Sequence, residues 1–129
     1  MRRILLDTHA YLWFVFDDAR LSEAAATTIA DSNSTPLLSV VSLWEIVVKN
    51  QLGKLQLGMA VDRFFSEHVY GRRLDLVAIE TRHLVGYSTL PLLHRDPFDR
   101  MIVAQALSLD VSVVTGDPWF APYGVDVTW

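Results

Sequence analysis

The sequence predicts an α/β fold in which helices cover both faces of a mostly parallel central sheet, giving a three-layer α/β/α arrangement. Short apolar runs of strand length alternate along the chain with longer segments of helical period. That order is typical of parallel sheets whose connections are helices. The 129 residues suit one domain spanning 1–129, and a hydrophobic fraction of 51% is ample for a core.

Strands are expected where apolar or β-branched residues run without interruption between turn residues. The runs that meet this description are 3–6, 37–41, 74–79, 111–115 and 125–129. Helices are expected between them, starting at residues that cap a helix N-terminus and ending near glycine or polar residues. The predicted helices are 10–16, 23–31 after Ser22, 43–52 after Ser42, 60–70, a segment up to 87 after Thr81, and 97–109 after Asp96.

Composition narrows the classes of function. The chain carries 11 Lys and Arg against 15 Asp and Glu, a net charge of −4, whereas a protein that coats nucleic acid is usually basic. A metal-dependent nuclease remains compatible, because a bound cation reverses the local charge. The absence of cysteine excludes disulfides and thiolate metal sites, which is compatible with the cytoplasm. We expect no membrane span and no signal peptide, because no apolar run approaches ~20 residues and Asp7 interrupts the first one.

Four acidic residues, far apart in the chain, are placed to meet. Asp7 and Asp117 follow predicted strands, while Glu45 and Asp99 are expected in the first turns of two helices. In a parallel sheet the carboxyl ends of the strands and the starts of the crossover helices share one edge, which is where ligands bind. Carboxylates gathered there repel one another unless a hard cation lies between them. The pattern therefore predicts a site for one or two divalent ions such as Mg²⁺.

Each of these acids also has an ordinary structural explanation. Glu45 completes the capping box Ser42-x-x-Glu45 and lies four residues before Lys49, a spacing that favours an ion pair within a helix. Asp99 is the third residue of a helix capped by Asp96, where the helix dipole favours negative charge.

The two acids that follow strands have structural alternatives as well. Asp117, between Gly116 and Pro118, suits a turn. Asp7 suits the cap of the first helix, a role also open to Thr8.

Basic residues flank the start of the last long helix. Arg95 and Arg100 are candidates for phosphate contacts, with a solvated surface charge as the alternative. His94 is a candidate proton shuttle, or else a merely exposed loop residue.

Four sequence blocks, in this order and with this spacing, resemble PIN-domain ribonucleases and, among them, the VapC-type toxins of bacterial toxin–antitoxin modules. The blocks are LLDTH at 5–9, SVVSLWEI at 39–46, RDPFDRMIVAQA at 95–106 and VTGD at 114–117. The similarity runs over nearly the whole chain. It implies a small α/β/α endoribonuclease that depends on Mg²⁺ or Mn²⁺.

The resemblance also implies roles for individual residues and partners. The acids of the family map onto Asp7, Glu45, Asp99 and Asp117 as metal-binding and catalytic residues, with Asp96 a weaker candidate nearby. Two hydroxyl residues, Thr8 and Thr115, match positions that line such sites, although capping and strand propensity are alternative reasons for them. The implied partners are an RNA substrate, a second copy of the chain in a homodimer, and a cognate antitoxin that covers the active-site groove.

Two other functions stay open at this point. A phosphatase of the haloacid dehalogenase type also places acids at strand ends, but it would need a second aspartate where this chain has His9. A non-catalytic domain that uses its groove only to bind a partner protein is the other alternative.

Overall fold

The structure, a computed structural model, describes residues 2–129, so Met1, the first residue of the predicted 1–129 domain, lies outside the described residues. Five strands form one sheet in the order β3-β2-β1-β4-β5, and every pairing is parallel. The strands are β1 (Arg2–Leu6), β2 (Ser34–Ser39), β3 (Asp75–Val77), β4 (Ser112–Val114) and β5 (Val127–Thr128). The predicted α/β class with a parallel sheet is confirmed.

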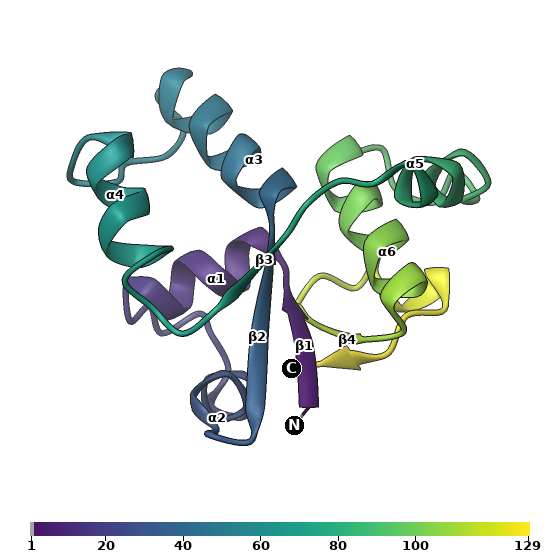
Figure 1. Cartoon of the computed structure of the whole chain (residues 1–129), viewed down its shortest axis with the longest axis horizontal. Coiled ribbons are helices and arrows are strands. Elements are labelled where there is room, and N and C mark those ends of the chain that lie inside the picture. The colour runs from purple at the N-terminus through teal and green to yellow at the C-terminus, as the bar shows by residue number, and fades with distance from the viewer. Residues whose placement is uncertain (1) are drawn as a thin grey trace.

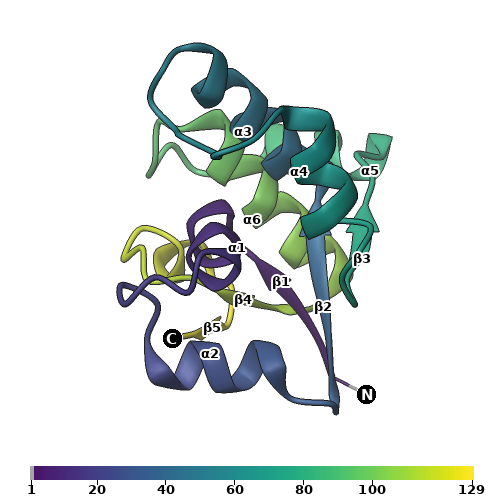
Figure 2. The ribbon, with the colours of Figure 1, turned by 90° about the vertical axis from the view of Figure 1, so that its left-hand side faces the viewer.

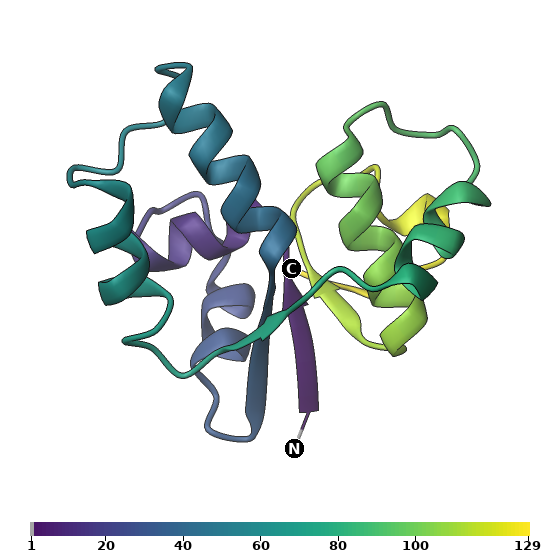
Figure 3. The same ribbon diagram turned by 45° about the horizontal axis from the view of Figure 1, so that its top comes forward.

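Six α-helices surround the sheet. They are α1 (Thr8–Val15), α2 (Glu23–Ala30), α3 (Val40–Gln51), α4 (Val61–His68), α5 (Thr81–Ser88) and α6 (Pro97–Leu109), and a short 3-10 helix, η1, spans Ala121–Tyr123. Helices α1, α2 and α4 lie on one side of β1 and β2, and α5 and α6 lie on the other (Figures 1 and 2). The view in Figure 3 shows these two groups with the sheet between them. Across residues 2–129, no helix combines the length and apolar composition that a membrane span requires.

The start of α3 differs from the prediction. Ser39, rather than Ser42, is the N-cap, and its Oγ accepts a hydrogen bond from the backbone N of Val41 at 3.1 Å. The expected strand 37–41 is therefore wrong at both ends, because β2 covers Ser34–Ser39. The two valines that follow Ser39 were assigned to the strand for their β-branched side chains, but the serine hydroxyl ends the strand and starts the helix.

The predicted N-cap is correct for α2 and wrong by one residue for α5. Ser22 caps α2, as predicted, with its Oγ 3.0 Å from the backbone N of Ala25. Helix α5 is capped by Glu80 instead of Thr81. The ring of His83 turns back to that cap, and its Nδ1 accepts a hydrogen bond from the backbone N of Glu80 at 3.0 Å.

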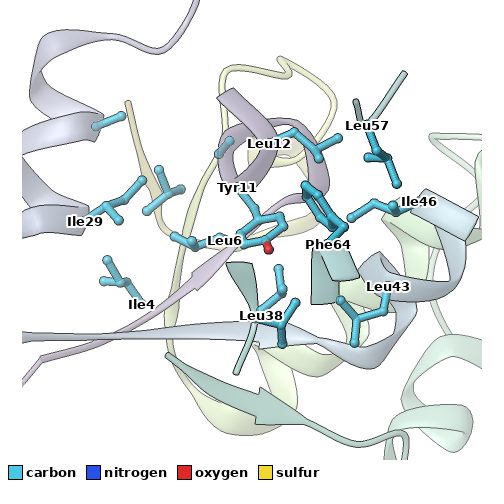
Figure 4. Close-up of a cluster of buried hydrophobic side chains, with 14 residues drawn as sticks. Ile4, Leu6, Tyr11, Leu12, Ile29, Leu38, Leu43, Ile46, Leu57 and Phe64 are labelled. Atoms are coloured by element: carbon cyan, nitrogen blue, oxygen red, sulfur yellow. The ribbon is translucent and has the colours of Figure 1, made fainter. Parts of the chain in front are cut away.

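Alternation along β1 divides the core between the two faces of the sheet. Ile4 and Leu6 point toward α1, α2 and α4, whereas Leu5 points toward α6. On the first face, the fully buried rings of Tyr11 and Phe64 pack edge to face at 6.5 Å between centroids (Figure 4). Both faces of the central strand are thus buried, as a parallel sheet requires.

The strand register brings the carboxyl ends of the three central strands to one edge. Leu6 of β1 is paired with Leu38 of β2 on one side and with Val114 of β4 on the other. Helices α1 and α3 leave the sheet from this edge (Figure 1). Residues that directly follow these strands are therefore close in space. Asp7 after β1 and Thr115 after β4 are in contact although 108 positions separate them in the sequence.

We expect Phe64→Ala to lower the free energy of unfolding by about 3–5 kcal/mol, because it leaves a cavity under α1. Tyr70→Ala is the matched control: Tyr70 is 73% exposed, so its truncation should change stability by about 0.5 kcal/mol or less. Urea denaturation of both variants checks this. Equal losses in the two variants would contradict the assigned core.

Candidate active site

The candidate site starts with Asp7, the first residue after β1. Its Oδ2 accepts a hydrogen bond from Thr115 Oγ1 at 2.5 Å. The backbone N of Asp117 in turn donates to Thr115 Oγ1 at 3.0 Å. Because β1 and β4 are neighbours, one threonine hydroxyl ties the two strand-end acids together, which places Thr115 where the sequence predicted it.

Asp7 also caps a helix. Its Oδ1 accepts a hydrogen bond from the backbone N of Ala10 at 2.7 Å, so the structural explanation offered from the sequence is correct for Asp7 and not for Thr8. Capping does not remove Asp7 from the site, because an ionised carboxylate has about four lone-pair positions. Burial raises the pKa of Asp7, and the bonds from Thr115 and Ala10 work in the opposite direction.

Glu45 forms a second part of the site on α3. It is 1% exposed, its Oε1 accepts a hydrogen bond from Thr8 Oγ1 at 2.6 Å, and its Oε2 contacts Lys49 Nζ at 2.5 Å. The ion pair expected from the i, i+4 spacing is confirmed. The sequence predicted Glu45 in the first turn of its helix. It lies in the second turn instead, because α3 starts at Val40.

Thr8 and Ser42 complete the surroundings of Glu45. Their hydroxyl oxygens lie 2.9 Å apart, and both residues are buried. Thr8 therefore lines the site, as the family resemblance implied. The predicted capping box between Ser42 and Glu45 is wrong, since Ser42 lies inside the helix.

Asp99 reaches the same edge from α6. Asp96 caps this helix as predicted, with its Oδ1 2.8 Å from the backbone N of Phe98, and Asp99 is the third helical residue. Burial raises the pKa of Asp99 to about 8, and the negative charges of its acidic neighbours add to the effect. The neighbours that act on it are Asp96, Glu45, Asp7 and Asp117. The four predicted acids therefore share one site, and their mutual repulsion is felt most strongly at Asp99.

Lys49 is the one ammonium group seen to enter this cluster among residues 2–129. Burial would lower its pKa, but the hydrogen bond and charge of Glu45, together with Asp96 and Asp99, outweigh burial and raise it. Lys49 is thus held in its protonated form and neutralises Glu45.

His94, a candidate proton shuttle from the sequence, lies beside the acids although it was not among the predicted metal-binding residues. Its Nε2 lies 3.1 Å from Asp99 Oδ2 and 3.5 Å from Asp117 Oδ2. The available signal was its position two residues before the cap of the acid-bearing helix, which brings a loop residue to the same edge. The alternative that it is merely an exposed loop residue is wrong, because its side chain is only 21% exposed.

Arg100 does not face the site. It is 6% exposed, donates to the backbone O of Pro91 at 2.8 Å, and stacks over the ring of Tyr87 at 4.9 Å. Both the expected phosphate contact and the alternative of a solvated charge are wrong for this residue. The reason is helical geometry: Arg100 is one residue after Asp99, so it points about 100° away around α6.

Arg95 is exposed. It forms no hydrogen bond or ion pair with another residue of the described range 2–129, and its proposed phosphate contact stays a prediction.

The donor set fits a hard divalent cation. Asp7, Asp99 and Asp117 offer carboxylate oxygens, and within the described chain none of the three is paired with a lysine or arginine. Oxygen ligands of this kind suit Mg²⁺ and Mn²⁺. Glu45 fits less well as a direct ligand, because it is already paired with the ammonium group of Lys49.

Comparison with known proteins places the chain in a family. The family model of the PIN domain matches residues 4–124. The chain therefore belongs to the PIN domain family, whose members are nucleases that generally use a divalent metal. No curated protein sequence matches the chain.

Several solved structures have a similar fold. VapBC2 from Rickettsia felis, bound to a DNA fragment from its promoter, has a TM-score of 0.71 at 14% identity, covering 97% of this chain and 96% of that chain. VapBC-1 from nontypeable Haemophilus influenzae has a TM-score of 0.64 at 14% identity, with coverage of 97% and 96%. FitAcB from Neisseria gonorrhoeae has a TM-score of 0.62 at 18% identity, with coverage of 96% and 95%. These similarities confirm the fold.

The raised pKa of Asp99 predicts how stability depends on pH. Its folded value of about 8 exceeds the ordinary 3.8, so folding favours the protonated acid. The contribution of Asp99 to the free energy of unfolding of the metal-free protein is therefore full below pH 4 and falls as pH rises toward 8.

Asp99→Asn should remove this loss of stability between pH 4 and pH 8. In chelator at pH 8 we expect the variant to be more stable than the wild type by at least about 1 kcal/mol, since one pKa unit corresponds to about 1.4 kcal/mol. The advantage should disappear near pH 4. Thermal unfolding across this pH range checks it, and a variant that is less stable at pH 8 would show that Asp99 is not under repulsion.

Proposed function

We propose that this chain is a divalent-metal-dependent endoribonuclease and the toxin of a toxin–antitoxin module. One observation carries the proposal: Asp7, Asp99 and Asp117 come from three separate segments of a PIN domain, meet at one sheet edge, and have no lysine or arginine paired with them in the described chain. Buried carboxylates that repel one another are costly unless a cation joins them.

The proposed roles follow from the contacts. Asp7, Asp99 and Asp117 would hold Mg²⁺ or Mn²⁺. When bound, such an ion supplies a Lewis acid that activates water and offsets the charge that develops on a phosphodiester. Thr115 orients Asp7 through its hydroxyl, and Glu45 keeps Lys49 protonated beside the acids. No side-chain nucleophile is needed for this hydrolysis.

A groove beside the acids supports RNA as the substrate. A cavity of about 460 Å³ runs between α1 and the end of α3, and its lining includes Thr8, His9, Lys49 and Lys54. Lys49 and Lys54 are the two lysines of the whole chain. A chain with net charge −4 that concentrates its lysines next to its acidic site offers a local path for a phosphate backbone. Single-stranded or loop RNA is the form that fits an open groove.

The proposed partners rest on the structural relatives and on exposed apolar side chains. Two of the relatives named above are VapBC proteins, and the sequence blocks of this chain resemble VapC-type toxins. We infer that a cognate antitoxin covers the groove of this chain and that two copies form a homodimer in the cytoplasm. Large exposed side chains such as Trp44, at 59%, and Leu92, at 90%, supply surface for such contacts.

The alternatives gain little from the structure. The family match argues against a phosphatase of the haloacid dehalogenase type, and His9 is exposed where that class needs its second aspartate. A domain that only binds a partner would have no reason to gather repelling acids, and divalent ions would leave its stability unchanged.

We expect Asp7→Asn and Asp99→Asn each to abolish cleavage of a mixed RNA pool in Mg²⁺ or Mn²⁺ while the protein stays folded, because each removes one charged oxygen donor. Asp62→Asn is the matched control, since Asp62 is exposed at the start of α4. Gel analysis of the RNA, with circular dichroism for folding, is the measurement. Cleavage by both purified variants, or by the wild type in chelator, would defeat the proposal.

A further inference from the structure

The backbone of His94 is fixed in place by Tyr123, the last residue of η1. Its N–H donates to the hydroxyl of Tyr123 at 2.7 Å. The buried Arg100 also reaches this hydroxyl, at 3.2 Å, and holds the backbone O of Pro91 in the same loop at 2.8 Å. The histidine is therefore presented to the acids by an anchored loop.

The hydrogen bond to the ring of His94 defines which nitrogen carries the proton. The backbone N of Asp96 lies 3.2 Å from His94 Nδ1 and can only donate, so Nδ1 accepts. A neutral imidazole has one donor and one acceptor nitrogen. The proton is therefore on Nε2, which is the atom that faces Asp99 Oδ2 at 3.1 Å and Asp117 Oδ2 at 3.5 Å.

This arrangement is not that of a metal ligand. One atom each from His94, Asp99 and Asp117 lie within 4.8 Å of one another, close enough to hold one ion. A histidine that binds metal through Nε2 needs a lone pair there, and its Nδ1–H normally donates to an oxygen acceptor. Here Nδ1 faces an N–H group instead, so the ring offers the acids a proton rather than a lone pair.

We propose that His94 is a positioning residue: its Nε2–H lies between Asp99 and Asp117 and attracts both carboxylates when no divalent ion is bound, and it gives up this contact when the ion takes the same oxygens. The inference rests on the proposed function, because it requires that these acids bind a divalent ion. It follows that the ion competes with His94, and that the histidine weakens cation binding.

Three variants test the competition. His94→Leu removes the donor, His94→Gln keeps an N–H donor at a similar distance from the backbone, and Asn33→Leu introduces leucine at an exposed residue just before β2, at the opposite edge of the sheet. Calorimetric titration with Mn²⁺ should show about 3- to 10-fold tighter binding by His94→Leu, the equivalent of one lost hydrogen bond. The other two variants should stay within about twofold of the wild type. If His94 is instead a ligand, His94→Leu will bind Mn²⁺ at least about tenfold more weakly, and the proposal is overturned.

Measurements without metal test the contact of His94 with the two aspartates. In chelator, His94→Leu should melt at a lower temperature than the wild type, and His94→Gln should recover most of the difference. Long-range ¹H–¹⁵N spectra should show the ring with its proton on Nε2, both before and after Mg²⁺ is added, with ring signals that change as the contact is released. A proton found on Nδ1, or an unchanged melting temperature in His94→Leu, contradicts the proposal.

The two proposals fail in different ways. Wild-type protein that binds neither Mn²⁺ nor Mg²⁺ overturns the proposed function and the competition together. Wild-type protein that binds Mn²⁺ and cleaves RNA, combined with weaker Mn²⁺ binding by His94→Leu, overturns only the role of His94.

Discussion

Repulsion among carboxylates at the carboxyl edge of the sheet is the constraint on which the rest of this molecule depends. The parallel register of β1 with β2 and β4 brings these acids together, and burial with the neighbouring charges raises the pKa of Asp99 to about 8. The chain offsets this cost locally. Asp7 receives a threonine hydroxyl and a helix N-terminus, and Glu45 receives an ammonium group. What remains unbalanced is the set of oxygens that a divalent ion would need.

The structural and functional explanations of these acids turn out to hold together. Asp7 caps α1 and also belongs to the cluster, and the Glu45–Lys49 ion pair of α3 lies at the same edge. A cap must lie at the end of a helix, and in this fold those ends lie where the strands stop. One residue can therefore satisfy both demands, so a capping role in the sequence does not argue against a site.

Much of the fold and of the acidic cluster could be predicted from the sequence. The alternation of apolar runs and helical segments gives the parallel sheet, and the acids that follow strands are brought together by topology alone. Boundaries were less certain, because Ser39 and Ser42 are both good caps and only the tertiary arrangement chooses between them. Two side-chain directions were not predicted, although each had a signal in the sequence. Arg100 turns away toward Tyr87 because it lies one residue after Asp99 on α6, and His94 turns in toward Asp99 from a position two residues before the cap of that helix.

The most direct test of the central claim is a crystal of the protein grown with Mn²⁺ and measured at the manganese absorption edge. The account predicts an anomalous peak among the carboxylate oxygens of Asp7, Asp99 and Asp117, with the Nε2 of His94 outside the coordination shell. A map without a peak at this edge of the sheet, or with Mn²⁺ bound only elsewhere on the surface, would contradict it.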